Sequence, residues 1–474
     1  MIKRNPKKSV FFGLLFIAYY FCLPRTLFEQ PYSTVIESEE GELLGAKIAR
    51  DGQWRFPAQD SIPEKFKKCI VYFEDEHFYQ HPGFNPIAMV KAAKQNHDAG
   101  RVVRGGSTLT QQVIRLSRGE KKRNYLEKIV ELVLATRLEF RYSKEKILEL
   151  YAAHAPYGGN VVGLEMASWR YFGVQPYQLS WAETATLAVL PNAPSLIYPG
   201  KNQQKLLDKR NGLLKKLYQE KIIDKTTYEL SILEDLPQKP YDLPQIAPHL
   251  LQNVARKAEG TRVKTTVKFA LQNRVNQIAA QYYNQYRQSE IYNLAIIVVD
   301  VETRNILSYV GNSPTDKDHQ KDVDIITAPR STGSILKPLL YASMLDAGEI
   351  LPNTLVADIP TQIAGYSPKN FDLTYDGAVP AHRALSRSLN IPSVLMLKDH
   401  GVYRFYDELQ QFKLRDINKH PNHYGLSLIL GGAESNLWDL SKTYAGLTST
   451  LNYFTAHSAK YRTDEFKELN WLHG

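Results

Sequence analysis

The sequence is poor in cysteine, which argues against a fold held together by disulfides. Only two cysteines occur among the 474 residues, Cys22 and Cys69. The first lies in an apolar run and the second on one face of an expected helix, so we expect no disulfide between them. Zinc-finger spacing and aromatic-rich basic repeats are absent, which argues against nucleic acid as a partner. No internal repeat of the solenoid type is present either.

The sequence also lacks an apolar run of the length that usually spans a membrane, about 20 residues. The run at residues 10–23 is shorter, and it follows a cluster of basic residues within the first eight positions. A cleaved signal peptide and an uncleaved signal anchor both begin in this way. Bulky residues at 20–23 replace the small residues of a cleavage site. We therefore expect residues 1–30 to form a cytoplasmic tail and a transmembrane signal anchor, with the rest of the chain exported.

Neither sign of charge dominates strongly. The chain has 59 Lys and Arg against 49 Asp and Glu, a formal net charge of +10. Anionic lipid and a diphosphate-bearing substrate are both compatible with this balance. A hydrophobic content of 43% fits a globular protein, and the length favours two or three domains.

Hydrophobic periodicity divides the exported part into two regions. A β-hairpin pattern over 32–56 is followed by helical spacing of apolar residues to about residue 233, including one long helical stretch over 125–151. Residues 236–244 are proline-rich, as in a linker. Strand-like segments with a helix between them follow. We expect a mainly α domain over 31–235, a linker over 236–262 and an α+β domain over 263–474.

Glu74 is the first candidate for chemistry. It follows Ile70 by four residues, so it borders the apolar face of a helix instead of open water. Partial burial raises the pKa of a carboxylate and prepares it to accept a proton from a hydroxyl group. A carboxylate of this kind, facing neutral hydrogen-bond donors, suits the transfer of a sugar from a phosphate-activated donor.

A glycine-led segment further along offers such donors. Gly105 and Gly106 precede a run of hydroxyl and amide side chains, and a cationic side chain follows them. These groups suit the stabilisation of a departing diphosphate. Lys128 and Glu131 are three residues apart on one helix face, and they add a cation and a second acid. The candidate substrate-binding residues are Ser107, Gln111, Gln112, Arg115 and Lys128.

Each of these patterns also has an ordinary explanation. A Glu-Asp pair on a helix is usually solvated, and a Gly-Gly-Ser-Thr run usually leads into a helix cap. A Lys-x-x-Glu pair is usually an exposed ion pair. The order and the joint content of the patterns are what favour a catalytic site.

Five blocks carry a family resemblance: Glu74-Asp-x-x-Phe78-x-x-His81-Pro-Gly83, Gly105-Gly-Ser-Thr-Leu-Thr-Gln-Gln112, Lys128-x-x-Glu131, Ser143-Lys-Glu-Lys-Ile-Leu-Glu-Leu-Tyr151 and Leu190-Pro-Asn-Ala-Pro194. In this order they resemble the lysozyme-like peptidoglycan glycosyltransferases, glycosyltransferase family 51. The resemblance implies that Glu74 is the base that activates the 4-hydroxyl of the acceptor sugar. Glu131 is the second candidate catalytic residue, either to hold a divalent metal on the diphosphate or to interact with the leaving oxygen. Two departures are present. Asn85 replaces an acid, and Glu127 stands where many members carry Arg, which reduces the expected affinity for the donor diphosphate.

The resemblance also implies substrates, partners and a location. The donor is a glycan strand on a polyprenyl diphosphate, and the acceptor is the lipid-linked disaccharide-pentapeptide precursor. A divalent cation such as Mg²⁺ is implied by the family and not by any ligand spacing in this chain; no organic cofactor is implied. The further implied partners are the membrane and other cell-wall synthesis proteins, without nucleic acid. The implied location is the bacterial cytoplasmic (inner) membrane, crossed once, with the catalytic domains on the periplasmic side.

A second chemistry is indicated later in the chain, where Ser334 precedes Lys337 by three residues. Serine needs a neighbour to take its proton, and a desolvated lysine three residues on can do so. Ser388 and Asn390 add a hydroxyl and an amide. These blocks resemble the penicillin-binding transpeptidases, which implies acylation of Ser334 by a D-Ala-D-Ala stem peptide or a β-lactam. Both halves together resemble the class A, bifunctional penicillin-binding proteins.

The transpeptidase resemblance lacks one part. No Lys-Thr-Gly strand follows the Ser-x-Asn block, and Lys442-Thr443-Tyr444 lies in a segment with helical spacing. We therefore expect a C-terminally truncated transpeptidase domain with an incomplete sheet, an exposed sheet edge and no activity.

Two alternatives stay open. A lytic enzyme also uses carboxylates in a lysozyme-like cleft, but it cuts glycan. A non-catalytic scaffold of a wall-synthesis complex binds without reacting. The glycine-led block and the anchor favour synthesis, and the presence of the two acids and of the Ser-x-x-Lys pair argues against the loss of all chemistry.

Overall fold

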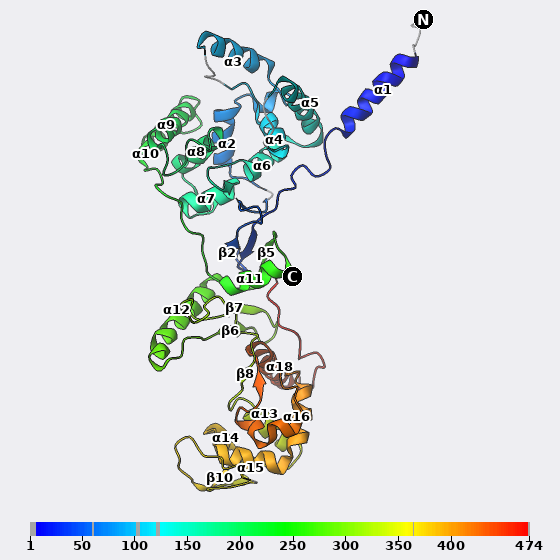
Figure 1. Ribbon diagram of the computed structural model, residues 1–474, viewed down its shortest axis with the longest axis vertical. Helices are drawn as coiled ribbons and strands as arrows, with labels where there is room; N and C mark the ends of the chain where they lie inside the picture. The colour runs from blue at the N-terminus through cyan, green and yellow to red at the C-terminus, as the bar shows by residue number, and fades with distance from the viewer. Residues whose placement is uncertain (1–5, 59–60, 101–104, 120–123, 364, 473–474) are drawn as a thin grey trace. The chain divides into compact units, whose positions relative to one another are not determined.

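The computed structural model describes residues 6–58, 61–100, 105–119, 124–363 and 365–472. The chain folds into two compact units, each with its own core (Figure 1). The first unit comprises Met1–Ile36, Leu43–Gln245 and Leu251–Val263, and the second comprises Glu37–Glu42, Ile246–Leu250 and Lys264–Gly474.

The first unit is mainly helical, as the sequence predicts. Its helices are α1 (Pro6–Phe21), α2 (Glu64–Glu74), α3 (Pro86–Asp98), α4 (Leu109–Ser117), α5 (Tyr125–Arg141), α6 (Lys144–His154), α7 (Leu164–Phe172), α8 (Trp181–Val189), α9 (Gln203–Gln219), α10 (Lys225–Leu233) and most of α11 (Pro248–Lys257). Short 3₁₀ turns lie at η1 (Phe78–Gln80), η2 (Pro176–Gln178) and η3 (Leu190–Asn192). Helix α2 packs against α8 and α9, and α4 packs against α5 and α6. Their apolar faces form one core around α2, α4 and α6.

The expected hairpin near the start of this unit is present. Strands β1 (Thr34–Glu37) and β2 (Leu43–Lys47) are neighbours in a sheet of order β2-β1-β5, with β5 at Arg262–Lys264. The backbone N–H of Ser38 donates to the carbonyl of Glu42 and closes the hairpin. Strand β3 (Trp54–Arg55) pairs in parallel with β4 (Val161–Val162).

The long helical stretch expected over 125–151 is interrupted. Tyr142 has an extended backbone and ends α5, and Ser143 begins α6 by accepting the backbone N–H of Lys146 on its side chain. A serine cap satisfies a backbone donor that the helix leaves without a partner, so it favours a new helix start at this point.

Helix α1 covers much of the expected anchor and is 16 residues long. Within the described part of the chain, no helix combines the length and the apolar character needed to cross a bilayer. The structure therefore does not confirm the transmembrane helix that the sequence predicts.

The second unit combines helices with short antiparallel strand pairs. Its helices are α12 (Phe269–Tyr286), α13 (Lys337–Asp346), α14 (Ala381–Ser386), α15 (Asn390–His400), α16 (Val402–Gln411), α17 (Pro421–Tyr424) and α18 (Leu437–Ala456), with 3₁₀ turns η4 (Arg287–Ser289) and η5 (Gly425–Leu430). Its strands are β6 (Ile296–Val299), β7 (Ile306–Val310), β8 (Arg330–Ser331), β9 (Leu355–Asp358), β10 (Gly377–Pro380) and β11 (Glu434–Ser435). The pairs are β6-β7, β8-β11 and β9-β10.

The strand-helix-strand order expected after the proline-rich segment is confirmed by β5, α12 and the antiparallel β6-β7 pair, although most of β5 belongs to the first unit. The expected linker over 236–262 is not wholly a linker. It contains α11, and β5 begins at its last residue. Residues 251–263 belong to the first compact unit because β5 completes the sheet next to β1.

Candidate active sites

Glu74 is the last residue of α2, and amide groups hold its carboxylate. Gln112 of α4 donates from Nε2 to Oε2 at 2.8 Å, and Asn192 donates from Nδ2 to Oε1 at 3.4 Å. Burial raises the pKa of Glu74, and it outweighs the two hydrogen bonds and the charge of Lys209, which act to lower it. A carboxylate with a raised pKa suits the role of a general base.

Asn192 is in turn oriented by a cation. Lys209 of α9 donates from Nζ to the Asn192 Oδ1 at 2.7 Å, so the amide turns its NH₂ group toward Glu74. Burial lowers the pKa of Lys209, while the charge of Glu74 acts in the opposite direction. Neither residue was predicted as part of the site. Asn192 lies 118 residues beyond Glu74, in a block that the family resemblance contains without a chemical role for it.

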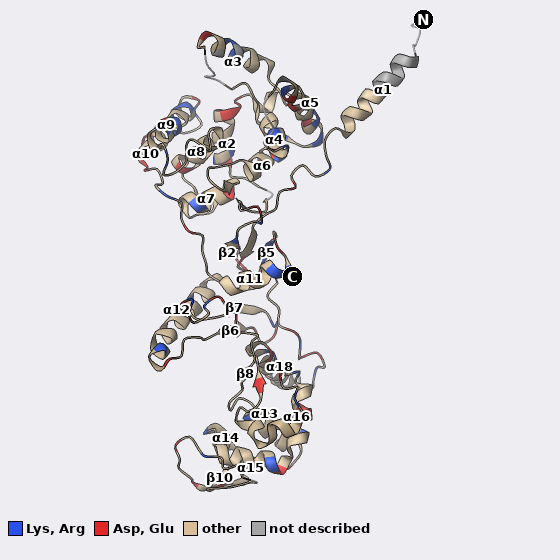
Figure 2. Cartoon of the chain, in the orientation of Figure 1, with Lys and Arg blue, Asp and Glu red and all other residues tan. Residues whose placement is uncertain are grey.

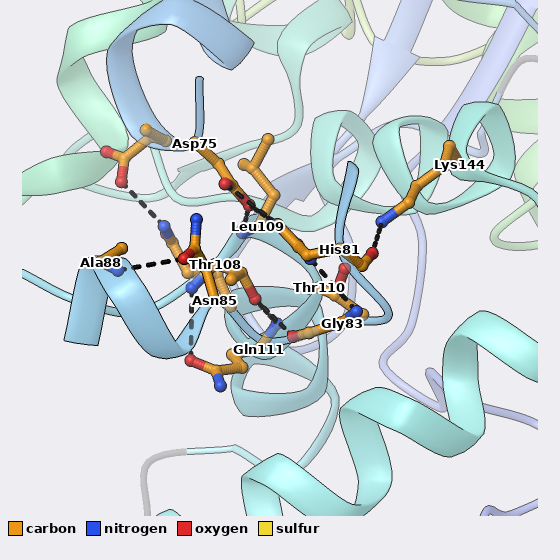
Figure 3. Close-up of polar contacts among 12 residues, drawn as sticks. Asp75, His81, Gly83, Asn85, Ala88, Thr108, Leu109, Thr110, Gln111 and Lys144 are labelled. Atoms are coloured by element: carbon orange, nitrogen blue, oxygen red, sulfur yellow. Dashed lines mark hydrogen bonds and ion pairs between the residues drawn. The ribbon is translucent and has the colours of Figure 1, made fainter. Parts of the chain in front are cut away.

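A buried carboxylate ties the turn after α2 to the start of α4 (Figure 3). Asp75 accepts the backbone N–H of Leu109 and the Nε2–H of His81, both at 3.0 Å. The His81 Nδ1 lies 3.2 Å from the backbone N–H of Gly83 and accepts it, so the proton of the ring is on Nε2. The positive end of the α4 dipole thus faces Asp75. This contact places the preceding residue, Glu74, beside α4.

Gly83 lets the same turn approach α5 closely. It has φ +93°, and a Cβ atom added there lies 2.8 Å from the carbonyl oxygen of Ala135. The Gly83 carbonyl accepts the hydroxyl of Thr108 at 2.7 Å (Figure 3). Thr108 also begins α4 through a capping box with Gln111, in which each side chain accepts the other residue's backbone N–H.

Two cations and a second carboxylate gather one turn further along α4. Arg115 donates from Nε and Nη2 to the two oxygens of Glu131 at 2.9 and 3.0 Å. The Nζ of Lys128 lies 3.2 Å from Glu131 Oε2 and 2.9 Å from Ser107 Oγ. Figure 2 marks basic residues in blue on both α4 and α5. Arg115 follows Gln112 by three residues, so this cluster shares a face of α4 with Gln112.

Glu131 differs chemically from Glu74. Burial acts to raise the pKa of Glu131, but the hydrogen bonds and charges of Arg115 and Lys128 outweigh it, and the pKa is lowered. Glu131 is therefore ionised and balances two cations. The pKa of Glu74 is raised and that of Glu131 is lowered, so Glu74 suits the role of proton acceptor and Glu131 that of a lasting negative charge.

The donors around Glu131 do not suit a divalent cation held by the protein. Both carboxylate oxygens already bind Arg115 and Lys128. Across the described ranges, no group of three or more His, Cys, Asp and Glu side chains is arranged to hold a metal ion. The expected Mg²⁺ thus stays a prediction of the family resemblance, and no step is assigned to it.

The predicted residues of the second site meet at the start of α13. The Nζ of Lys337 donates to the Ser388 carbonyl at 2.8 Å and to Asn390 Oδ1 at 2.8 Å, and it lies 3.3 Å from Ser388 Oγ. Burial lowers the pKa of Lys337 to about 8. Ser334 is exposed one turn before Lys337, and among the hydrogen bonds of the described residues none joins its hydroxyl to Lys337. Lys337 is therefore turned toward Ser388 and Asn390.

Lys442 and Thr443 lie in α18, as the sequence predicts, and not in a strand. Lys442 is buried and pairs with Glu468 at 2.9 Å, and Thr443 bonds the carbonyl of Asp439 one turn earlier in the helix. Both side chains are occupied by helix packing, so they do not form a wall for the Lys337 site.

Comparison with known proteins gives two family matches. The family described as "Transglycosylase" matches residues 41–218, and the family described as "Penicillin binding protein transpeptidase domain" matches residues 294–450. The first matched range contains Glu74 and Glu131, and the second contains Ser334, Lys337 and Asn390.

Penicillin-binding proteins of several bacteria match most of this chain. Penicillin-binding protein 1C of Escherichia coli (strain K12) is 35% identical over 423 residues, covering 89% of this chain and 54% of that protein. Penicillin-binding protein 1B of Vibrio cholerae is 28% identical and covers 87% of this chain and 56% of that protein. The chain thus spans about half the length of these relatives. A crystal structure of penicillin-binding protein 1A from Haemophilus influenzae matches with 18% identity and a TM-score of 0.45, over 88% of this chain and 68% of the crystallised one.

Proposed function

The chain belongs to the class A penicillin-binding proteins, and from this premise we propose that its first unit polymerises the lipid-linked disaccharide-pentapeptide precursor into glycan strands. The donor in this proposal is a growing strand on a polyprenyl diphosphate. Polyprenyl diphosphate is the product released at each addition. The transglycosylase match supports the proposed substrate class, and the geometry of the first site supports the proposed roles of individual residues.

Glu74 is the proposed general base. It takes the proton of the acceptor 4-hydroxyl as that oxygen bonds to the anomeric carbon of the donor, while the bond from this carbon to the diphosphate breaks. Its burial and raised pKa support the role, because a carboxylate with a low pKa is a weak proton acceptor. Gln112 and Asn192 hold the carboxylate in place from two sides.

Arg115 and Lys128 are the proposed binding groups for the departing diphosphate. Both are cationic, and both contact Ser107 and Glu131. A cluster with fixed geometry stabilises developing negative charge without reorganising during the reaction. Glu131 is proposed to hold the two cations in position. This role suits a carboxylate with a lowered pKa, because it requires no proton transfer from Glu131.

One observation carries the proposal: the half-buried carboxylate of Glu74 and the cation cluster are attached to the same face of α4, through Gln112 and Arg115. The test is the variant Glu74→Gln with fluorescent lipid precursor. We expect a folded protein that forms no glycan polymer on a gel. The matched control is Glu76→Gln, which changes an exposed side chain two residues away. We expect this variant to polymerise the precursor normally. Polymerisation by Glu74→Gln at a rate near that of the unchanged chain contradicts the assignment.

A lytic enzyme is the competing function for the same carboxylates, and the substrate separates the two. Incubation with polymeric peptidoglycan alone and with lipid precursor alone distinguishes them. Synthesis consumes only the precursor. Release of soluble fragments from the polymer, with the precursor left intact, identifies a lytic enzyme instead. A scaffold without chemistry changes neither substrate.

For the second unit we propose that a polypeptide of this sequence is not acylated efficiently. The proposal rests on Lys337, which bonds Ser388 and Asn390 instead of Ser334, and on the sequence, in which Lys-Thr-Gly does not occur. A fluorescent penicillin is the probe, with Ser334→Ala as the blank. We expect labelling of the two proteins to be equal after denaturing electrophoresis. Strong labelling that the Ser334→Ala variant abolishes overturns the proposal.

We also propose that residues 1–30 attach the chain to the cytoplasmic membrane, with both units on its outer side. The support is the basic cluster before an apolar segment and the kinship with penicillin-binding proteins. In this arrangement the first unit lies next to the lipid-linked substrate that it uses.

A further inference from the structure

The segment between β9 and β10 contributes a buried side chain to the start of α15. Asn370 is 2% exposed, although its neighbours Lys369 and Phe371 are both exposed. Its Oδ1 accepts the backbone N–H groups of Asn390 at 3.0 Å and Ile391 at 3.3 Å. The first N–H groups of a helix have no partner inside the helix. Asn370 therefore caps α15 from a distant part of the chain.

Asp358 determines which way the Asn370 amide points. Asp358 ends β9 and is fully buried; its Oδ1 accepts from Asn370 Nδ2 at 2.7 Å and its Oδ2 accepts the backbone N–H of Asp376 at 3.0 Å. The carbonyl of Thr374 accepts from the same Nδ2 at 2.9 Å. Carboxylate and carbonyl oxygens only accept hydrogen bonds. The NH₂ group of Asn370 must face them, and its oxygen must face α15.

The amide of Asn390 is oriented in the same manner. Its Nδ2 donates to the carbonyl of Lys369 at 2.9 Å, so its Oδ1 is the atom that meets the Lys337 ammonium, at 2.8 Å. Two adjacent residues of one segment thus fix both the backbone and the side chain of Asn390. A line of hydrogen bonds runs from Asp358 through Asn370 and Asn390 to Lys337.

We propose that Asn370, oriented by Asp358, is a positioning residue that holds Asn390 against the Lys337 ammonium and keeps water away from it. The proposal concerns the second unit alone and goes beyond the proposed glycosyltransferase reaction, on which it does not depend. Among the hydrogen bonds of the described residues, none joins Asn370 or Asp358 to Ser334. Their effect reaches the reacting groups only through Asn390.

The surroundings of Lys337 explain what this positioning achieves. Its Nζ bonds neutral oxygens, and burial alone lowers its pKa to about 8. Helix α13 packs against α14, α15 and α16. Within the described residues, the titratable side chains of these helices form no hydrogen bond with Nζ: His382, Arg383, Lys398, Asp399, His400, Tyr403, Arg404, Tyr406, Asp407 and Glu408.

Loss of the Asn390 acceptor by itself lowers this pKa, whereas water that enters beside the ammonium raises it by reversing the effect of burial. We expect the entry of water to outweigh the lost hydrogen bond, so loosening Asn390 raises the pKa of Lys337. The test follows the lysine side-chain signals by NMR in the full chain, with lysine-selective ¹³C labelling and Lys337→Arg to assign the signal. We expect Lys337 to titrate near pH 8 in the unchanged chain. In Asn370→Ala its midpoint moves by at least one pH unit toward 10.5, the ordinary lysine value. The matched control Asn422→Ala removes an exposed asparagine of the same unit and leaves the midpoint unchanged.

A second variant keeps the test decisive if Asn370→Ala does not fold. Asn370→Asp alone sets two carboxylates against each other at Asp358, and we expect it to raise the Lys337 midpoint as well. Asn370→Asp combined with Asp358→Asn restores a donor facing an acceptor between residues 358 and 370, although the Thr374 carbonyl loses its donor. We expect the midpoint to return part of the way toward pH 8. A folded Asn370→Ala protein with an unchanged midpoint overturns the proposal. A folded exchange variant whose midpoint stays as high as that of Asn370→Asp also overturns it, because Asp358 then does not orient residue 370.

Discussion

Glu74 and Glu131 show how neighbours decide the chemistry of a carboxylate. Two amide groups donate hydrogen bonds to Glu74 and stabilise its negative charge. Burial destabilises that charge by more, so the pKa of Glu74 is raised. Glu131 is held by Arg115 and Lys128, and its pKa is lowered. The same residue type therefore supplies a proton acceptor in one place and a fixed negative charge in the other.

The charge of Lys209 gives a prediction for the pH dependence of polymerisation. Glu74 accepts a proton only when ionised, so the rate rises as the pH increases through its pKa, which lies above the ordinary 4.5. Lys209 lowers this pKa. In Lys209→Met we expect the acid limb of the pH–rate profile for glycan synthesis to move to higher pH.

The matched control for this prediction is Lys205→Met, which removes an exposed ammonium from the same helix. Its acid limb stays where it is in the unchanged chain. If Lys209→Met lowers the rate equally at every pH, Lys209 orients Asn192 without acting on the proton affinity of Glu74.

The sequence identifies a candidate site residue only where its spacing from neighbouring residues indicates its position. Glu74 was predicted from its place on a helix face, and Arg115 from its position after the glycine-led block. Asn192 and Lys209 approach Glu74 only because α8 and α9 pack against α2. No local pattern encodes that packing, so sequence reasoning did not identify them.

Among the elements, α4 organises the first site. Its start is held by the Thr108 capping box and by Asp75, and its partly buried face carries Gln112 and Arg115. The turn that reaches it depends on Gly83, whose positive φ and close approach to the Ala135 carbonyl leave no room for a Cβ atom.

Two glycines of the first unit therefore respond to alanine in opposite directions. Gly83→Ala meets backbone at 2.8 Å with φ +93°, and we expect a loss of about 2 kcal/mol or more of unfolding free energy, together with loss of polymerisation. Gly212 is an exposed residue of α9 with nothing within 4 Å of an added Cβ atom, and for Gly212→Ala we expect a gain of up to about 1 kcal/mol of unfolding free energy. Urea unfolding measures both. A neutral effect of Gly83→Ala contradicts the close approach.

The break between α5 and α6 shows the limit of periodicity at this scale. Apolar spacing continues across residues 141–144, which predicts one helix, but Tyr142 is extended and Ser143 caps the next helix. The serine followed by helix-forming residues was the available signal. Capping chemistry decides such boundaries more directly than hydrophobic pattern does.

For the whole molecule, the sequence predicted two chemistries in two regions, and the structure places each set of residues in its own compact unit. The boundary was less predictable, because β5 follows the proline-rich segment yet completes a sheet that begins at residue 34. Long-range strand pairing of this kind leaves no trace in local composition.

The proposed membrane attachment is tested on the complete chain. We expect expressed protein to sediment with membranes and to resist extraction at alkaline pH, because an inserted apolar segment is not held by charge alone. A chain that starts at residue 31 is released by the same wash. Recovery of the complete chain in the soluble fraction after this wash contradicts an inserted anchor.

The hydrogen bond from Thr108 to the carbonyl of Gly83 has a consequence for the evolution of the first unit. It joins the two residues that flank residues 84–107, Gly83 and Thr108. The hydrogen bond from the backbone N–H of Leu109 to Asp75 lies next to it. Helix α3 (Pro86–Asp98) lies between these two anchor points, so its residues can be exchanged without displacing Asp75 or Leu109. Ser107 has to be kept, because it contacts Arg115 and Lys128. Laboratory grafting of a foreign helix in place of α3 offers a route to chimeras that keep the carboxylate of Glu74 in register.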